Sequence, residues 1–201
     1  MAAEHFENAF YVDHKTSSDV FLLALLELMK EKAYSDISIS ELCRKADLSR
    51  NTFYKFFPEK NALLEYLKED IALGFVAYKE TIAKEKLSSS MEAFVHYFSF
   101  WYQLREWVDV LVENEMWEQI AMPNDKELAL LSNRNWDRYL LQTEQTMEMM
   151  RTFVAAGCVQ LVKWWSRNNY EKTPEEMAEL VSYIISGHLR KSKTTGIQKK
   201  Q

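Results

Sequence analysis

The chain has 201 residues, a formal net charge of −5, 47% hydrophobic residues and 27% charged residues. This composition supports one folded domain, or a small domain joined to a medium one, and excludes a chain that is disordered throughout. Only four glycines and three prolines occur, which argues against a sheet-rich protein with many tight turns and against a glycine-rich phosphate loop. We therefore predict an all-α protein.

Residues 1–14 show no strong periodicity, and the first clear helical signal follows them. Ser17 or Ser18 is expected to cap a helix that runs to about Lys32. The side chains of this helix are apolar almost all round, which indicates that it is buried on several sides. We expect it to pack across the next two helices and to complete a three-helix unit.

The segment 37–60 predicts two short helices joined by a tight turn. Ser38 or Ser40 is expected to cap the first helix, and Glu41 stands three residues after Ser38, which is the spacing of a capping box. Asp47 lies in the turn, where it can enter the left-handed region of backbone conformation at a modest cost.

The second helix of this segment is expected over 50–57, with Ser49 as its cap and Pro58 as its stop. Phe53 and Phe57 are four residues apart and therefore share a buried face. The polar residues point elsewhere and form a surface rich in hydrogen-bond donors: Arg50, Asn51, Thr52, Tyr54 and Lys55. Such a helix pair is typical of DNA-binding helix-turn-helix units, although an ordinary αα-corner has the same pattern.

The same segment resembles the DNA-binding half of TetR-type (TetR/AcrR) transcriptional regulators. The positions that carry the resemblance are Ile37-Ser38-Ile39, Ala46-Asp47-Leu48-Ser49, Thr52-Phe53-Tyr54, Phe57 and Lys60. One position departs from the family pattern, because Asp47 replaces the glycine of the turn. The resemblance implies about nine helices, with an N-terminal three-helix DNA-binding domain and a larger C-terminal helical domain for ligand binding and dimerisation.

The resemblance also implies contacts with double-stranded DNA. Phosphate contacts are expected from residues that match family positions with this role: Ser38, Ser49, Tyr54 and Lys60. Contacts with base edges are expected from the polar face of the second helix: Arg50, Asn51, Thr52 and Lys55. The local charge agrees with this expectation, since residues 38–60 contain five Lys or Arg and three Asp or Glu, which leaves a net charge of +2.

Beyond residue 60, apolar periodicity predicts six further helices. We expect them over 60–86, 91–114, 115–121, 124–150, 151–168 and from 174 onwards. Thr173 is expected to cap the last of them, with Pro174 at its first position. The predicted domains are 1–60 for DNA binding, 61–190 for effector binding and dimerisation, and 191–201 as a basic tail that is either disordered or in contact with DNA.

Aromatic residues are frequent in the predicted C-terminal domain, where they are candidates to line a pocket for a small hydrophobic or aromatic effector. The candidate pocket residues are Phe75, Tyr97, Trp101, Arg105, Trp117, Trp136 and Tyr139. The same rings also fit an ordinary aromatic core, because rings buried between helices are common.

Residues 151–187 are predicted to form a homodimer interface. Adjacent residues of a helix point about 100° apart, so Trp164 and Trp165 cannot both face one core, and one of them is expected at a surface or an interface. The resemblance implies that the last two helices pair with their two-fold copies in a four-helix bundle. Such a dimer presents two recognition helices to a palindromic operator.

Motifs for catalysis, metal binding and membrane insertion do not occur in the sequence. The four histidines lack metal-ligand spacing and no G-x-S-x-G elbow is found, so we predict no enzyme, no metal and no cofactor. Cys43 and Cys158 are expected to be buried and reduced. The longest apolar run, 20–26, is too short to span a bilayer, and no signal peptide is visible. These features predict a cytoplasmic protein without a membrane partner.

The sequence therefore predicts a DNA-binding transcriptional regulator. The expected mode of action is that of a homodimeric repressor, which a small-molecule effector releases from its operator. One alternative is a dimeric adaptor of the same fold that acts through protein partners and does not bind DNA itself. Another is a small-molecule enzyme with an all-α pocket, although no catalytic motif supports it.

Overall fold

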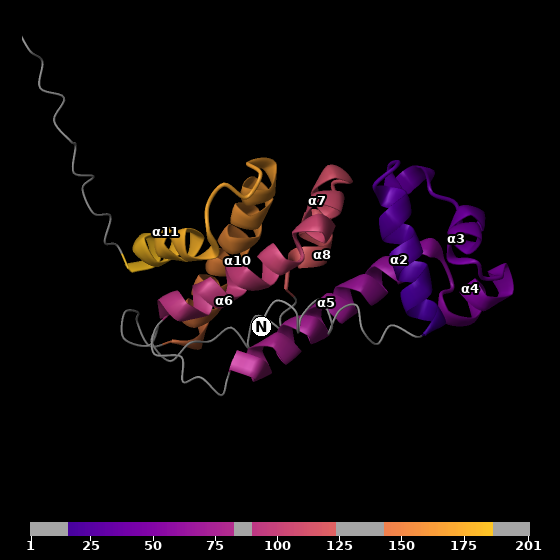
Figure 1. The fold of residues 1–201 in the computed structure, drawn as a ribbon. Helices are drawn as coiled ribbons and strands as arrows, with labels where there is room; N and C mark the ends of the chain where they lie inside the picture. Colours follow the sequence, from indigo (N-terminus) through magenta and orange to yellow (C-terminus); the bar gives the residue numbers. More distant parts are fainter. Residues whose placement is uncertain (1–15, 83–89, 124–142, 187–201) are drawn as a thin grey trace, which may run out of the picture.

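The computed structural model describes residues 16–82, 90–123 and 143–186. These residues contain α-helices, one 3₁₀ turn and no strand, so the all-α prediction is confirmed. The turn η1 covers Tyr34–Asp36. The nine α-helices of the described residues carry the labels of Figure 1: α2 (Ser17–Met29), α3 (Ile39–Ala46), α4 (Arg50–Phe56), α5 (Lys60–Ile82), α6 (Ser90–Gln103), α7 (Arg105–Glu113), α8 (Trp117–Ala121), α10 (Glu144–Arg167) and α11 (Pro174–Ser186).

The helices form two groups, and α5 extends from one toward the other (Figure 1). Helices α2, α3 and α4 form the helix-turn-helix unit at one end, with α2 in contact with both of the others. In the second group, α6 packs against α11. Helix α7 lies between the groups and contacts both α2 and α10. The predicted three-helix unit at the N-terminal side is thus confirmed.

The start of α2 differs from the prediction. Thr16 is the N-cap rather than Ser17 or Ser18, because its hydroxyl accepts from the Asp19 amide at 3.3 Å and the Asp19 carboxylate accepts from the Thr16 amide at 3.2 Å. This reciprocal capping box satisfies two amides that a helix end otherwise leaves without partners. The helix also ends earlier than predicted, at Met29 rather than near Lys32.

The aromatic helix predicted after residue 90 is two helices, α6 and α7, because the chain bends at Leu104. The backbone of Leu104 has φ −95° and ψ 15°, and its amide donates to the Trp101 carbonyl at 3.1 Å, only three residues back. The guanidinium of Arg105 donates to the Tyr102 carbonyl at 3.1 Å, which satisfies an acceptor at the break. Trp101, Leu104 and Trp107 are all buried. No glycine or proline marks this bend, so tertiary burial directs it.

Helix α10 runs without a break through Met150, where the sequence analysis expects one. The helix begins after Thr143, whose hydroxyl accepts from a backbone amide of the first turn at 3.3 Å. Arg151 spans the expected breakpoint, because its guanidinium bonds to Glu144 at 2.5 Å and to the Met147 carbonyl at 3.2 Å. The predicted break is therefore wrong, and side-chain contacts along the helix hold the two halves together.

The adjacent tryptophans of α10 lie on different faces, as predicted. Trp165 is fully buried, contacts Phe98 edge-to-face at 5.9 Å between ring centroids, and donates its indole N–H to the Lys172 carbonyl at 2.9 Å. Trp164 is 45% exposed. The helix therefore presents one large ring to the core and one to the surface.

Other local predictions are also confirmed. Thr173 and Glu176 form a reciprocal capping box at the start of α11, whose first residue is Pro174. The Thr173 amide donates to the Glu176 carboxylate at 2.8 Å, and the Glu176 amide donates to the Thr173 hydroxyl at 3.2 Å. Cys43 and Cys158 are buried free thiols, and burial raises the pKa of both. The N-terminal arm, the end of the helix expected over 60–86, most of the helix expected over 124–150 and the basic tail lie outside the described residues.

Candidate DNA-binding interface

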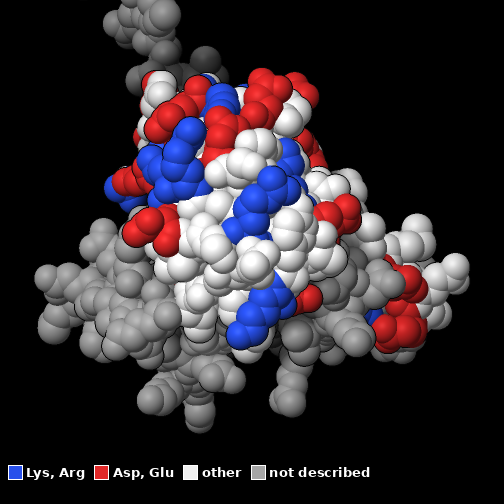
Figure 2. Space-filling model, turned by 90° about the vertical axis from the view of Figure 1, so that its right-hand side faces the viewer, with Lys and Arg blue, Asp and Glu red and all other residues white. Residues whose placement is uncertain are grey.

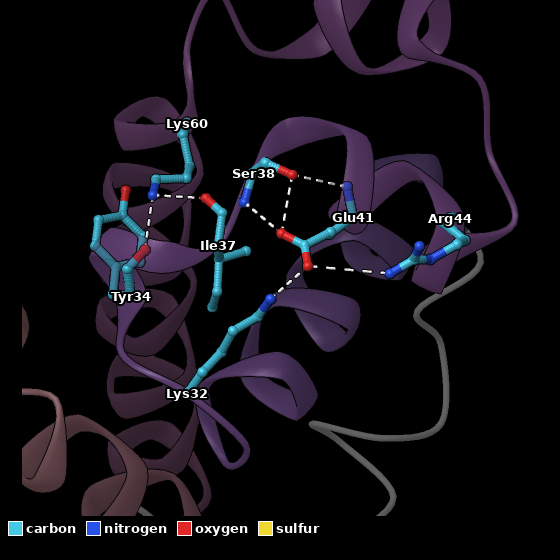
Figure 3. Close-up of polar contacts among 7 residues, drawn as sticks. All are labelled: Lys32, Tyr34, Ile37, Ser38, Glu41, Arg44 and Lys60. Carbon is cyan, nitrogen blue, oxygen red and sulfur yellow. Dashed lines mark hydrogen bonds and ion pairs between the residues drawn. The ribbon is translucent and has the colours of Figure 1, made fainter.

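Helix α3 is anchored at its N-terminus by a group of polar contacts (Figure 3). Ser38 is the N-cap, because its hydroxyl accepts from the Glu41 amide at 3.2 Å. The Glu41 carboxylate accepts in return from the Ser38 amide at 3.0 Å and hydroxyl at 2.9 Å. The ammonium of Lys32 donates to the same carboxylate, and the Arg44 guanidinium lies 4.0 Å from it. The hydrogen bond from Lys32, followed by those from Ser38, lowers the pKa of Glu41 to about 2.

The turn between α3 and α4 is closed without a glycine. Asp47 has φ 52° and ψ 39°, which is the left-handed conformation predicted for it. The amide of Leu48 donates back to the Cys43 carbonyl at 3.0 Å. Ser49 then caps α4, since its hydroxyl accepts from the Thr52 amide at 3.0 Å and shares a hydrogen bond with the Thr52 hydroxyl at 2.8 Å.

Helix α4 is held from its inner side by phenylalanine rings. Phe53 is fully buried and Phe57 nearly so. Both contact Phe21 of α2 edge-to-face, with ring centroids 5.2 Å and 6.3 Å apart. The helix ends at Phe56, one residue earlier than predicted, because Pro58 favours the extended backbone seen at Phe57 (φ −127°, ψ 117°).

The outer face of α4 is polar, as the sequence predicts. Its exposed polar residues are Arg50, Asn51, Tyr54 and Lys55, and Thr52 is half-buried beside its cap. Phe56, the last residue of the helix, is also exposed, and the Lys55 ammonium lies 5.6 Å from the centroid of its ring. The Arg50 guanidinium donates to the Ser40 hydroxyl at 3.3 Å and to the Tyr54 hydroxyl at 3.4 Å, and it lies 5.9 Å from the centroid of the Tyr54 ring. Five of the eight predicted DNA-binding residues therefore lie together on one short helix.

Figure 2 looks onto this end of the molecule. Lys and Arg side chains form separate clusters from the upper left to the lower middle of the described surface, and Asp and Glu side chains lie at its upper edge and at its sides. Arg44, at the end of α3, has an 80% exposed side chain and adds to the exposed positive charge. Arg44 was included in the sequence prediction only through the local charge, and Ser40 was not predicted as a partner of Arg50. Both residues lie on α3, next to α4, and their proximity to α4 in the sequence was the available signal.

Lys60 does not share the exposed face of α4. Its ammonium donates to the carbonyl of Tyr34 at 2.7 Å and to that of Ile37 at 2.8 Å, and it lies 4.1 Å from the centroid of the Tyr34 ring (Figure 3). Burial lowers the pKa of Lys60. Two of its three N–H donors are thus used within the protein. The phosphate contact predicted for Lys60 stays a prediction.

Four of the predicted effector residues meet in a chain of ring contacts. The centroid distances are 6.2 Å between Phe75 and Tyr97, 6.4 Å between Tyr97 and Trp101, and 4.8 Å between Trp101 and Trp117. The indole of Trp117 also donates to the Val159 carbonyl at 2.9 Å. These rings pack closely on one another at edge-to-face angles, which are the favoured geometry of a core.

The other predicted effector residues do not join this cluster. Arg105 is exposed and lies over the Tyr102 ring, 5.0 Å from its centroid. Trp136 and Tyr139 lie outside the described residues. A cavity of about 20 Å³ borders Trp101 between α2, α5, α6 and α7. This volume suffices for one water molecule and not for an organic effector.

Neither a membrane span nor a metal cluster appears in the described part of the chain. No helix within residues 16–82, 90–123 and 143–186 combines the length and the apolar character needed to cross a bilayer. In the same ranges, no group of three or more His, Cys, Asp or Glu side chains is placed to hold a metal ion.

Two family profiles match the chain. The profile of bacterial regulatory proteins of the tetR family matches residues 21–67, and that of a transcriptional regulator C-terminal region, also of the TetR group, matches residues 88–187. The chain belongs to the TetR family. The first match includes all of α3 and α4, so the TetR family assignment rests on the same residues that form the exposed face.

Curated relatives resemble this TetR-family chain over part of their length. The HTH-type dhaKLM operon transcriptional activator DhaS of Lactococcus lactis subsp. lactis (strain IL1403) is 32% identical over 66 residues, which are 31% of this chain and 35% of that protein. The uncharacterized HTH-type transcriptional regulator YvdT of Bacillus subtilis (strain 168) is 38% identical over 50 residues, which are 25% of this chain and 26% of that protein. The match thus spans about a third and about a quarter of these relatives.

A solved structure shares the fold over most of the chain. The dihydroxyacetone kinase operon activator DhaS superposes with a TM-score of 0.50 at 14% sequence identity, and the match covers 85% of this chain and 94% of that chain. At this identity the superposition shows a common arrangement of helices. It agrees with the TetR family assignment made from the profiles.

The Glu41 contacts predict a pH dependence of stability. The pKa of Glu41 is lower in the folded protein than its ordinary value of 4.5, so the ionised carboxylate stabilises the fold above about pH 4.5 and this contribution is lost as the pH falls toward 2. Glu41→Gln keeps a capping side chain and removes the charge. We expect its Tm to lie below that of the wild type at neutral pH and the difference to shrink as the pH falls through this window.

Thermal unfolding followed by circular dichroism between pH 2 and pH 7 measures this difference. Glu65→Gln, on the exposed side of α5, is the matched control. A Tm difference between wild type and Glu41→Gln that stays constant over the whole range would contradict the assignment of the charge.

Proposed function

We propose that this TetR-family chain is a homodimeric DNA-binding regulator that represses transcription. The observation that carries the proposal is the exposed polar face of α4, on a helix fixed from behind by Phe53 and Phe57. The major groove of B-DNA admits an α-helix, and its base edges pair with side chains of this kind, Arg with guanine and Asn with adenine. In this proposal Arg50, Asn51 and Lys55 face base edges, together with Thr52.

Phosphate contacts are proposed for hydroxyl and ammonium donors around this face: Ser38, Ser49, Tyr54 and Lys60. Such contacts fix the register of a protein on the duplex and carry no sequence information themselves. The net charge of −5 for the whole chain does not oppose this role, because binding to phosphate depends on the local field, and residues 38–60 carry a net charge of +2. Figure 2 shows exposed Lys and Arg side chains at this end.

Lys55→Ala tests the DNA-binding proposal. We expect its affinity for duplexes selected by the wild-type protein from a random pool to fall roughly 5- to 100-fold, since a base contact contributes about 1–3 kcal/mol of discrimination. The loss on unselected DNA is expected to be smaller. Mobility shift at fixed salt concentration measures both affinities.

The control is Lys172→Ala, which removes an exposed lysine between α10 and α11 and is expected to bind as the wild type does. An unchanged affinity of Lys55→Ala would contradict the assignment. A wild-type protein that retains no duplex would favour the alternative, a dimeric adaptor. Transcription from a retained fragment, measured with and without the protein, distinguishes repression from activation. Activation is the role in the name of the Lactococcus lactis relative.

The homodimer is proposed from an apolar stripe on α10. Met149 is 67% exposed, Phe153 is 68% exposed, and Gly157 and Trp164 continue the same face at helical spacing, with the exposed polar residue Gln160 between them. Contiguous exposed apolar side chains of this size mark interaction surfaces. At Gly157 a Cβ atom has no neighbour within 4 Å in the single chain. The isolated fold therefore does not need glycine there, and we propose that a partner helix approaches at this point.

Gly157→Arg separates the dimer from the fold. Gly157 is exposed and a Cβ atom placed there meets no atom within 4 Å, and a residue other than glycine favours a helix interior. A partner helix packed against this position leaves no room for the new side chain. We expect Gly157→Arg to sediment as a monomer with wild-type helix content, as measured by analytical ultracentrifugation and circular dichroism.

Glu148→Arg is the matched control, because Glu148 is exposed and lies nine residues away, on the opposite side of the same helix. It is expected to remain a dimer. A Gly157→Arg protein that also remains a dimer would place the interface elsewhere.

An effector is proposed to act through the aromatic cluster of Phe75, Tyr97, Trp101 and Trp117. The indole N–H of Trp101 is buried and has no partner with hydrogen-bond geometry among the described residues. The adjacent cavity holds only a water-sized volume, so a small hydrophobic or aromatic molecule must displace rings when it binds. It changes DNA binding only if it prefers one arrangement of the rings over the other.

Tryptophan fluorescence tests the effector proposal with a panel of indole-sized aromatic and short hydrophobic compounds. We expect a compound that shifts the emission also to release the selected duplex. We expect Trp101→Phe to bind this compound more weakly than the wild type does, because the substitution removes the buried indole N–H group of Trp101. Release of the duplex without any change in emission would place the effector away from the cluster.

A further inference from the structure

Helix α7 ends in a side chain that bonds to the helix-turn-helix unit. Asn114 follows the last residue of α7, and its Oδ1 accepts the backbone N–H of Tyr34 at 2.8 Å. Its Nδ2 donates to the Met29 carbonyl at 3.1 Å and to the Val110 carbonyl at 2.9 Å. One side chain therefore joins the end of α7 to the end of α2 and to the start of η1.

Tyr34 extends this contact to the starts of α3 and α5. Its carbonyl accepts from the Lys60 ammonium at 2.7 Å, and its hydroxyl donates to Asn61 at 2.7 Å. The same ammonium donates to the Ile37 carbonyl at 2.8 Å, directly before the cap of α3 (Figure 3). The helices that flank the recognition helix are thus tied to the residue that Asn114 holds.

Helix α7 is also bonded to α10. The Asp109 carboxylate accepts from the Ser166 hydroxyl at 2.5 Å and from the Tyr170 hydroxyl at 2.9 Å. Burial, followed by the hydrogen bond with Asp109, raises the pKa of Tyr170, so its hydroxyl stays a donor at neutral pH. Ser166 lies in the last turn of α10. Figure 1 shows α7 between α10 and the helix-turn-helix unit.

The orientation of the helix-turn-helix unit is fixed more firmly by two connections to the rest of the molecule than by one. Helix α5 is continuous from Lys60 to Ile82 and joins the two helix groups covalently. A unit held only by one helix retains freedom to rotate about that helix, because motion between linked units is the default where their interface is small. The unit is also attached to α7 by apolar packing, because side chains of α2 and α7 line the same small cavity. The Asn114 hydrogen bonds add directional contacts at the end of this packing, and together the two oppose the rotation.

We infer that α7 is a strut that sets the orientation of the helix-turn-helix unit relative to α10, and that Asn114 is the positioning residue at its end. The inference rests on the proposed function, in which α4 contacts DNA and α10 pairs with its two-fold copy. Under that function, the orientation decides the distance between the two recognition helices. It therefore decides the half-site spacing that the dimer accepts.

Three variants isolate the contribution of Asn114. Asn114→Ala removes all of its side-chain hydrogen bonds, and Asn114→Asp keeps an acceptor for the Tyr34 amide while it loses the donor to Met29. Asn168→Ala is the matched control. Asn168 also follows the last residue of its helix and donates to the carbonyl four residues back, that of Trp164 at 2.7 Å, but this bond stays within one helix end.

Mobility shift provides the first measurement. The probes are the palindromic duplex selected by the wild type, its derivatives with base pairs added or removed between the half-sites, and a single half-site. Wild type and Asn168→Ala are expected to lose affinity steeply when the spacing changes. Asn114→Ala is expected to bind the optimal duplex about tenfold more weakly, because a smaller fraction of molecules has the competent orientation.

The spacing profile and the half-site distinguish positioning from a loss of folded protein. We expect Asn114→Ala to have a flatter spacing profile than the wild type and an unchanged affinity for the half-site, with Asn114→Asp in between. A partly unfolded variant loses affinity for every probe in the same proportion. A wild-type spacing profile for Asn114→Ala, or an equal loss on the half-site, overturns the inference.

A second measurement needs no DNA. Spin labels are attached at Asn51→Cys on α4 and at Lys172→Cys after α10, and labelled chains are diluted with unlabelled chains. The distribution of distances between the two labels then reports the orientation of the helix-turn-helix unit relative to α10. Asn114→Ala is expected to broaden this distribution, and Asn168→Ala is not. An unchanged width overturns the strut. A broadened distribution in a protein whose wild type binds no duplex supports the strut and overturns the proposed function alone.

Discussion

The contact of Phe53 and Phe57 with Phe21 is the interaction on which the DNA-binding end depends. Helix α4 has only seven residues, and isolated helices of that length are marginal in water, so its geometry has to come from packing. The edge-to-face contacts with Phe21, at 5.2 Å and 6.3 Å between centroids, fix one side of the helix to α2. The polar residues are left on the other side because a helix whose inner face is buried has its remaining positions directed outward.

The polar contacts around this aromatic packing have a different task, which is to fix the unit within the molecule. The ammonium of Lys60 is partly buried, and two backbone carbonyls replace the water that it loses. Glu41 joins the cap of α3 to Lys32 in the preceding loop. Asn114 forms three hydrogen bonds at the end of α7 and so joins chain segments that are 80 residues apart. These contacts concern the placement of α4 rather than its formation.

Local signals in the sequence were sufficient for the ends of the short helices and insufficient for the long ones. Ser38, Asp47, Ser49 and Thr173 act as predicted, because capping and left-handed turns depend on residues within one turn of one another. The bend at Leu104 and the unbroken passage of α10 through Met150 were not predicted. The bend at Leu104 follows from burial of large side chains on both sides of it, and the continuity of α10 follows from the contacts of Arg151. Neither glycine nor proline occurs at these two positions to indicate the outcome. For the candidate site, the exposed face of α4 was predicted, whereas the inward position of Lys60 was not.

The sequence by itself determined the all-α class, the helix-turn-helix segment and the separation of its aromatic and polar faces. It could do so because helical periodicity and caps are encoded by residues that are near neighbours in the chain. Only the tertiary structure decided which side chains connect the two groups of helices. No local pattern indicates the partners of Tyr34, Lys60 and Asn114, since their contacts between helices join residues 23 to 85 positions apart. Such contacts exist only once the helices have packed.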